Sequence, residues 1–264
     1  MDFDSELASL NRDLSFFPQR AFDFKEFSMV IDQDIGDVGG QVWDAEIILA
    51  HYFDQKENSA SQSWDAKQRG QKVLEVGAGT GIAGLVCSFL GAEVVLTDVE
   101  PTLRITDRTA ASVDTGNKVE VAELRWGEDV EKFKSTYGEF DTVIACDVVY
   151  HEELYDGLIE TLFSLCKDSG RVFLSFEQRR KDLAPFMEKL SRLFQTDLLA
   201  SELMLDARER ANVYVYCLTK KVVIAGQEET FSTTINPEEE YNNEQKRDSA
   251  TGEQEEEGEG KDLS

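Results

Sequence analysis

The chain has 264 residues and 41% of them are apolar, so it is long enough to bury a substantial hydrophobic core. Its formal net charge is −26. Residues 226–264 hold thirteen acidic and three basic side chains, which leaves the other 225 residues at about −16. Such a chain repels phosphate backbones and anionic lipid surfaces. We therefore expect no nucleic-acid or membrane partner and favour a cationic, lysine-bearing one.

A few residue types indicate the compartment and the metal content. The first residues, MDFDSELASL, do not have the pattern of a secretory signal, and no run reaches 18 apolar residues. The four cysteines form no C-x-x-C pair and lie in apolar runs, which is typical of core thiols in a reducing compartment. The two histidines, His51 and His151, are far apart, so we expect no metal site. We predict a cytoplasmic protein, with the nucleus as a second location.

The N-terminal part reads as a flexible segment followed by a β extension. Residues 1–21 are polar and predicted to be flexible. Residues 22–31 alternate between apolar and polar side chains, which predicts a strand or a hairpin arm. Residues 44–53 then have the spacing of a helix with one apolar face, and residues 54–70 are polar and serine-rich, as in a surface loop.

From residue 72 onward, strand and helix patterns alternate. Apolar runs that predict strands occur at residues 73–76, 93–97, 118–124, 140–146 and 171–176. Helical patterns occur at residues 82–90, 101–113, 152–166 and 183–194. This alternation predicts an α/β fold with a mostly parallel sheet and helices on both faces.

The end of the chain departs from this alternation. Two β-like runs, 196–205 and 213–219, have no helical pattern between them, and we expect them to close the sheet in an antiparallel direction. Residues 226–264 contain too few apolar side chains for a core and are predicted to be a disordered acidic tail. The sequence therefore predicts one domain over residues 22–225.

A glycine-rich loop between the first of these strands and the helix after it predicts a ligand site. Glycines at 77, 79 and 81 let the backbone turn sharply and let a ligand approach without a Cβ in the way. Asp98 ends the next strand, 19 residues after Gly79, where a carboxylate can accept both hydroxyls of a ribose. In an open sheet the carboxyl ends of these strands form the ligand crevice. We therefore predict a nucleoside ligand.

The loop alone leaves two cofactors open. Residues 79–84 also satisfy G-x-G-x-x-G, the pattern of nicotinamide dinucleotide enzymes. Glu75, just before the turn, would face a pyrophosphate unfavourably but would suit S-adenosylmethionine, which carries a sulfonium and an ammonium. A structural alternative is that Glu75 binds backbone amides of the loop.

Five segments together resemble the family 16 protein methyltransferases. They are GQVWD at residues 40–44, VLEVGAGTG at 73–81, LRWG at 124–127, DVVY at 147–150 and EQR at 177–179. The chain looks most like the branch that includes the lysine methyltransferase of valosin-containing protein. The resemblance covers about residues 22–220. It implies a Rossmann-like seven-stranded methyltransferase sheet, mostly parallel with an antiparallel closing strand, and S-adenosylmethionine as cofactor.

The resemblance also implies roles for individual residues. The residues that it assigns to cofactor binding are Trp43, Glu75, Gly77, Gly79, Asp98 and Trp126. It places Asp147 and Tyr150 at the reaction centre. For the two tryptophans and Tyr150 the structural alternative is core packing. For Asp147 it is a cap at the end of a strand.

The substrate class is inferred partly from what is missing. Methyltransferases that act on planar amides or base amines usually carry an Asn/Asp-Pro-Pro-aromatic motif after the fourth strand, whereas residues 147–150 read DVVY. We therefore predict a protein-lysine methyltransferase, a monomer whose substrate could be a chaperone or ATPase such as valosin-containing protein. The alternatives are an arginine or small-molecule methyltransferase, a nicotinamide enzyme and an inactive cofactor-binding module.

Overall fold

The computed structural model describes residues 17–55, 70–179, 183–200 and 202–221. Residues 1–16, most of the predicted loop at 54–70 and the predicted acidic tail lie outside this part of the chain. The strands are β1 (Gln19–Asp23), β2 (Ser28–Asp32), β3 (Lys72–Val76), β4 (Glu93–Asp98), β5 (Val119–Glu123), β6 (Phe140–Cys146), β7 (Cys166–Glu177), β8 (Phe194–Leu198) and β9 (Val213–Lys220). The helices are η2 (Val38–Gly40), α2 (Asp44–Gln55), α3 (Ile82–Phe89), α4 (Leu103–Ser112), α5 (Val130–Tyr137), η4 (Glu152–Leu154), α6 (Tyr155–Leu165), α7 (Ala184–Leu193) and α8 (Glu202–Ala211).

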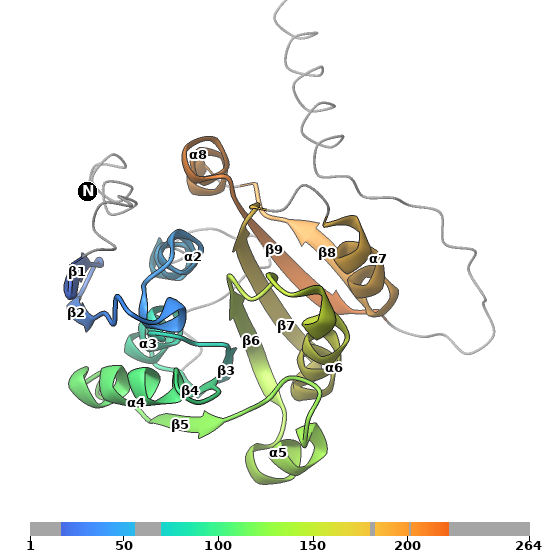
Figure 1. Ribbon diagram of the computed structural model, residues 1–264, viewed down its shortest axis with the longest axis horizontal. Coiled ribbons are helices and arrows are strands. Elements are labelled where there is room, and N and C mark those ends of the chain that lie inside the picture. Colours follow the sequence, from blue (N-terminus) through green and yellow to red (C-terminus); the bar gives the residue numbers. More distant parts are fainter. Residues whose placement is uncertain (1–16, 56–69, 180–182, 201, 222–264) are drawn as a thin grey trace, which may run out of the picture.

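Seven strands form the main sheet in the order β5-β4-β3-β6-β7-β9-β8 (Figure 1). β3, β4, β5, β6 and β7 pair in parallel. β9 lies between β7 and β8 and runs antiparallel to both. β8 is therefore the strand at this edge of the sheet. The predicted α/β class, with a mostly parallel sheet and an antiparallel closing strand, is confirmed.

Helices cover both faces of the sheet and bury two separate apolar clusters. α2, α3 and α8 pack on one face, where Ile47, Leu85 and Phe173 are fully buried. α5, α6 and α7 pack on the other face around Leu158 and Phe186. The parallel strands are buried on both sides, which explains why they read as short continuous apolar runs.

A hairpin of β1 and β2 precedes the main sheet (Figure 1). Alternate residues of both strands are buried, and Phe22, Met29 and Ile31 join the cluster around α2 and α3. β1 begins at Gln19, three residues before the predicted start of the domain at residue 22. The hairpin delivers the chain to η2 and α2, which border the cavity described below.

Two α-helices of the described residues, α5 and α8, were not predicted from the sequence. The run at residues 196–205, predicted as β-like, ends as a strand at Leu198, and α8 occupies residues 202–211. Leu203, Met204, Ala207 and Ala211 are buried, and this helical spacing packs α8 against the cluster on the α2 face. α5 occupies residues 130–137, where no element was predicted.

Candidate active site

A cavity of about 600 Å³ lies at the carboxyl ends of the parallel strands, within the size range of small-molecule sites. Its walls come from the segment before α2, the glycine loop after β3, the end of β4 and the segments that follow β5, β6 and β7. Seven of the eight predicted site residues line it: Trp43, Gly77, Gly79, Asp98, Trp126, Asp147 and Tyr150. The structure thus brings together residues that are up to 107 positions apart, as the ligand rule for open sheets requires.

The glycine loop has a backbone that requires glycine at two cavity positions. Gly77 and Gly79 have φ angles of 63° and 52°, in the left-handed region. A Cβ on Gly79 would lie 2.8 Å from the carbonyl oxygen of Gly39, and one on Gly77 would lie 2.9 Å from the Trp126 ring. The loop therefore lies in close contact with η2 on one side and Trp126 on the other. Its glycines leave the backbone without side chains toward the cavity.

Asp98 connects the end of β4 to the glycine loop. Its Oδ2 accepts a hydrogen bond from the Gly79 N–H at 2.8 Å, and its Oδ1 accepts one from the Val99 N–H at 2.8 Å. Burial raises the pKa of Asp98, while the two backbone donors act in the opposite direction. The carboxylate oxygens keep further lone pairs toward the cavity, where they fit the hydroxyls of a ribose.

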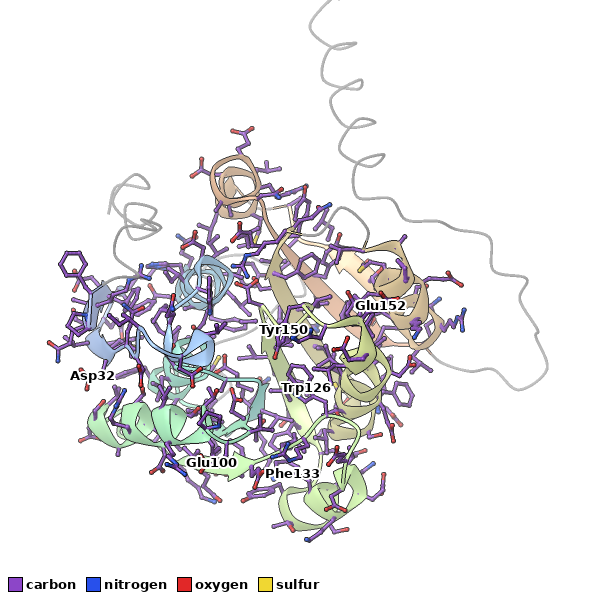
Figure 2. All side chains as sticks on the ribbon, viewed as in Figure 1. Asp32, Glu100, Trp126, Phe133, Tyr150 and Glu152 are labelled. Atoms are coloured by element: carbon purple, nitrogen blue, oxygen red, sulfur yellow. The ribbon has the colours of Figure 1, made fainter. Side chains whose placement is uncertain are left out.

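Aromatic side chains form two other parts of the wall. Trp126 and Tyr150 lie close together (Figure 2), with ring centroids 6.3 Å apart in an edge-on arrangement. The Trp43 indole Nε1 donates to the carbonyl of Val38 at 3.1 Å. All three rings face the cavity, and flat apolar surfaces of this kind suit a purine ring. Trp126 also packs against the apolar cluster on the α5, α6 and α7 face, so it both lines the cavity and contacts the core.

Asp147 follows β6 in an unusual backbone conformation and is held from β7. Its φ is 51°, which is rare for a residue other than glycine. Its Oδ1 accepts from the Glu177 N–H at 2.9 Å, and its Oδ2 lies 3.3 Å from a guanidinium nitrogen of Arg179. Burial raises the pKa of Asp147, and the Arg179 charge opposes this shift. Asp147 thus both anchors the strand end and presents a carboxylate to the cavity.

Glu75 is absent from the residues that line the cavity, and its contact with the cofactor stays a prediction. Residues 73 and 75 of β3 point to the same face of the sheet, and Val73 packs in the cluster on the α3 side. Glu75 therefore lies beneath α3, fully buried, and its Oε2 accepts from the Gly84 N–H at 2.8 Å. The structural alternative expected Glu75 to bind backbone amides of the glycine loop, whereas its hydrogen bond comes from Gly84, inside α3.

Glu46 is a cavity residue that the sequence analysis missed. It lies in the first turn of α2, is 4% exposed, and accepts from the Ile82 N–H at 2.6 Å and from the Thr80 hydroxyl at 3.1 and 3.2 Å. Burial raises the pKa of Glu46 to about 8. The only signal in the sequence was a carboxylate inside the apolar run of a helix.

The position of His151 and two searches of the described residues complete the description. His151, expected on a surface loop, is exposed at the cavity rim. The described residues contain no group of three or more metal-binding side chains placed to hold an ion. No helix in the described ranges has the length and apolar character to span a membrane.

The features of the cavity fit S-adenosylmethionine. The cofactor is a nucleoside with a cationic amino-acid arm and no phosphate. The site offers Asp98 for a ribose, aromatic walls for an adenine and bare loop backbone beside them. The carboxylates of Asp98 and Asp147 also line the cavity, and they suit a cation better than a pyrophosphate.

Comparison with known sequences identifies the family. A family model described as lysine methyltransferase matches residues 23–193. EEF1A lysine methyltransferase 3 from Xenopus tropicalis is 37% identical over 67% of this chain and 74% of its own length, and the Mus musculus protein is 33% identical over 81% and 88%. Protein N-lysine methyltransferase METTL21A from Mus musculus is 32% identical over 67% and 79%.

Solved structures share the fold. The 16S rRNA N2 G1207 methyltransferase of T. thermophilus has a TM-score of 0.54 at 19% identity, covering 78% of this chain and 51% of its own. A methyltransferase from Agrobacterium tumefaciens has a TM-score of 0.51 at 13% identity, covering 78% and 71%. At these identities the likeness concerns the fold and not the substrate. The sequence matches and the cavity together establish that the chain belongs to the lysine methyltransferase family, whose methyl donor is S-adenosylmethionine.

Proposed function

We propose that this chain transfers a methyl group from S-adenosylmethionine to lysine side chains of a protein. The observation that supports this most directly is the shared cavity in which the cofactor features, Asp98 and Trp126, meet the carboxylate of Asp147 and the ring of Tyr150. Family membership supplies lysine as the acceptor. We assign cofactor binding to Trp43 and the glycine loop as well.

Methyl transfer depends mainly on how the amine is aligned with the methyl group of the cofactor. When bound, the cofactor supplies an activated methyl group on a good leaving group. The protein holds the amine in line and excludes water. An amine attacks only when neutral, and its usual pKa is about 10.4, so burial that disfavours the ammonium helps. We assign Asp147 to accept hydrogen bonds from the amine, and Tyr150 to contact the aliphatic stem.

Two substrate proteins are candidates. The resemblance to the branch of the valosin-containing protein methyltransferase suggests a chaperone or ATPase of that kind. The relatives at 37% and 33% identity are named for EEF1A, which makes EEF1A the second candidate. The net charge of −26 supports a protein with a basic surface around the target lysine, and disfavours nucleic acid and anionic membranes as partners.

We also infer a monomer located in the cytoplasm, with the nucleus as a second location. All four cysteines are free thiols, and burial raises the pKa of Cys87, Cys146 and Cys166. Unpaired, protonated thiols suit a reducing compartment. Light scattering of the purified chain and fractionation of cells that express it test both statements.

A labelling experiment tests the proposed activity. The purified chain is incubated with radiolabelled S-adenosylmethionine and either cell extract, purified EEF1A or purified valosin-containing protein, and labelled bands are analysed by mass spectrometry. We expect methyl-lysine in a protein band, lost in an Asp98→Ala variant. Label on arginine or on small molecules, or no label at all, would contradict the proposal. A thermal shift with NAD but not with S-adenosylhomocysteine would instead indicate a nicotinamide enzyme.

A further inference from the structure

The guanidinium of Arg179 lies in the cavity wall, beside an aromatic ring and two carboxylates. Its guanidinium carbon lies 4.5 Å from the centroid of the Trp43 ring. Its terminal nitrogen lies 3.3 Å from Asp147 Oδ2 and 2.9 Å from Glu177 Oε2. Trp43, Asp147 and Arg179 all line the cavity. One internal cation therefore contacts the face of one aromatic ring and two carboxylates.

An aromatic face beside a carboxylate is also what a lysine ammonium needs. Cations bind over indole rings within about 6 Å of the centroid, and a carboxylate in reach adds a charge-assisted hydrogen bond. On the basis of the proposed function, we propose that Arg179 occupies the entry position of the substrate lysine and must be displaced before methyl transfer. Arg179 is then an internal competitor that raises the substrate concentration needed for half-maximal rate.

The neighbours of Arg179 are fixed independently of it. Asp147 is held by the Glu177 N–H through Oδ1, and Trp43 is held by the Val38 carbonyl. The Arg179 side chain is 42% exposed, whereas the Asp147 side chain is 8% exposed. Arg179 can therefore swing toward solvent while the ring and the carboxylate stay in place. Its removal should leave the lysine position formed and vacant.

The test is Arg179→Gln, which removes the charge and keeps a polar side chain of similar reach. A state that is only partly open lowers apparent affinity by the open fraction. We expect KM for the methylated protein to fall by about three- to tenfold, because the ion pairs and the ring contact that hold Arg179 in place are individually modest. We expect kcat to equal that of the parent or exceed it. Affinity for S-adenosylhomocysteine, measured by calorimetry, should stay within twofold.

Arg125→Gln is the charge-matched comparison. Arg125 also lines the cavity, but its guanidinium pairs with Glu123, at 3.2 Å, whereas that of Arg179 pairs with Asp147 and Glu177. If the effect of Arg179 were only to reduce attraction for cationic substrates, both variants would lower KM equally. We expect the Arg125 variant to change it by less than half as much. Equal changes would overturn the proposal.

A second measurement needs no protein substrate. n-Butylammonium, which mimics the end of a lysine side chain, is titrated into the chain saturated with S-adenosylhomocysteine, and the indole N–H signal of Trp43 is followed by NMR. The Arg179 variant should bind it several-fold more tightly than the parent. Equal or weaker binding, or a loss of S-adenosylhomocysteine affinity, would show that Arg179 positions Trp43 instead. Absence of turnover in the parent concerns the proposed function, whereas this titration concerns Arg179 alone.

Discussion

The buried carboxyl of Glu46 should make the stability of the protein depend on pH above neutrality. Burial is the main cause that raises the pKa of Glu46 to about 8, against an ordinary value of 4.5. Between these two values the folded chain binds a proton that the unfolded chain has lost. Its contribution to stability is therefore complete below pH 4.5 and is lost as pH rises to about 8. Replacement of Glu46 by glutamine removes the contribution of this group, while Glu75, whose pKa burial also raises, contributes in the same direction in both proteins.

A second buried group gives the parent a pH slope of the opposite sign below pH 6.5. Burial lowers the pKa of His51 from 6.5 to about 4, so the unfolded chain binds the extra proton between these values. That slope has the opposite sign and offsets the Glu46 slope below pH 6.5. Between pH 6.5 and 8 the Glu46 slope remains, and about 1.5 pH units at about 1.4 kcal/mol each give about 2 kcal/mol. For a domain of this size that is a Tm difference of about 4–8 °C.

Thermal unfolding of Glu46→Gln and the parent, from pH 6 to 9, measures this difference. The amide oxygen of a glutamine can accept from the Ile82 N–H and from the Thr80 hydroxyl, as Glu46 Oε1 does. His51 is present in both proteins, so its slope cancels in the comparison, and the Tm of the variant should rise relative to that of the parent from pH 6 to about pH 8. Glu128→Gln, at the exposed cavity rim, controls for the loss of one formal charge. Parallel profiles for Glu46→Gln and the parent would refute the reasoning, because Glu46 would then be ionised in the folded chain.

Three further substitutions test the cavity and the loop. Asp98→Ala should weaken S-adenosylhomocysteine binding in calorimetry at least tenfold, because a charge-assisted hydrogen bond contributes about 1.5–3 kcal/mol; unchanged affinity would remove Asp98 from the site. Asp147→Asn should lower kcat about tenfold or more, a loss of about 1.4 kcal/mol, and leave cofactor affinity within a few-fold; full turnover would reduce Asp147 to a strand-end anchor. Gly84→Ala should destabilise the fold by about 1–3 kcal/mol in chemical denaturation, because the new Cβ would clash with Leu96 and lie 2.6 Å from Glu75 Oε2; an unchanged midpoint would mean that α3 moves freely.

The central sheet was predictable because its strands are buried on both faces. Residues 140–146 form β6 with the predicted limits, since seven largely apolar residues ending at an aspartate have few other placements. α8 was not predictable by the same means. Its buried side chains belong to the same apolar stretch of sequence as the end of β8. Only their packing against the α2 face shows that the spacing of buried residues changes from the two of a strand to the 3.6 of a helix.

In the site, too, residues placed by adjacent strands could be predicted, whereas a residue placed by the packing of a distant helix could not. Asp98 and the glycines could be predicted because the loop and the end of the next strand are neighbours in any sheet of this order. Alternation along β3 places Glu75 on the same face of the sheet as Val73, beneath α3, and this position could be read from the sequence. Glu46 could not be foreseen. Its role depends on where α2 docks against a loop 34 residues away in the sequence.

The docking of α2 has a consequence for the order in which the protein is assembled. α2 contacts β7, β9 and α8, and the Ser175 hydroxyl donates to the Ala45 carbonyl at 2.8 Å across 130 residues. At translation rates of about 5–20 residues per second, β9 is synthesised on the order of ten seconds after α2. During that interval α2 can pack against α3, which follows it closely in the chain, but it still lacks α8 and β9, and contacts so distant in sequence form slowly. Chains released before β9 should therefore fail to bind S-adenosylhomocysteine, even though every residue that lines the cavity has already been made.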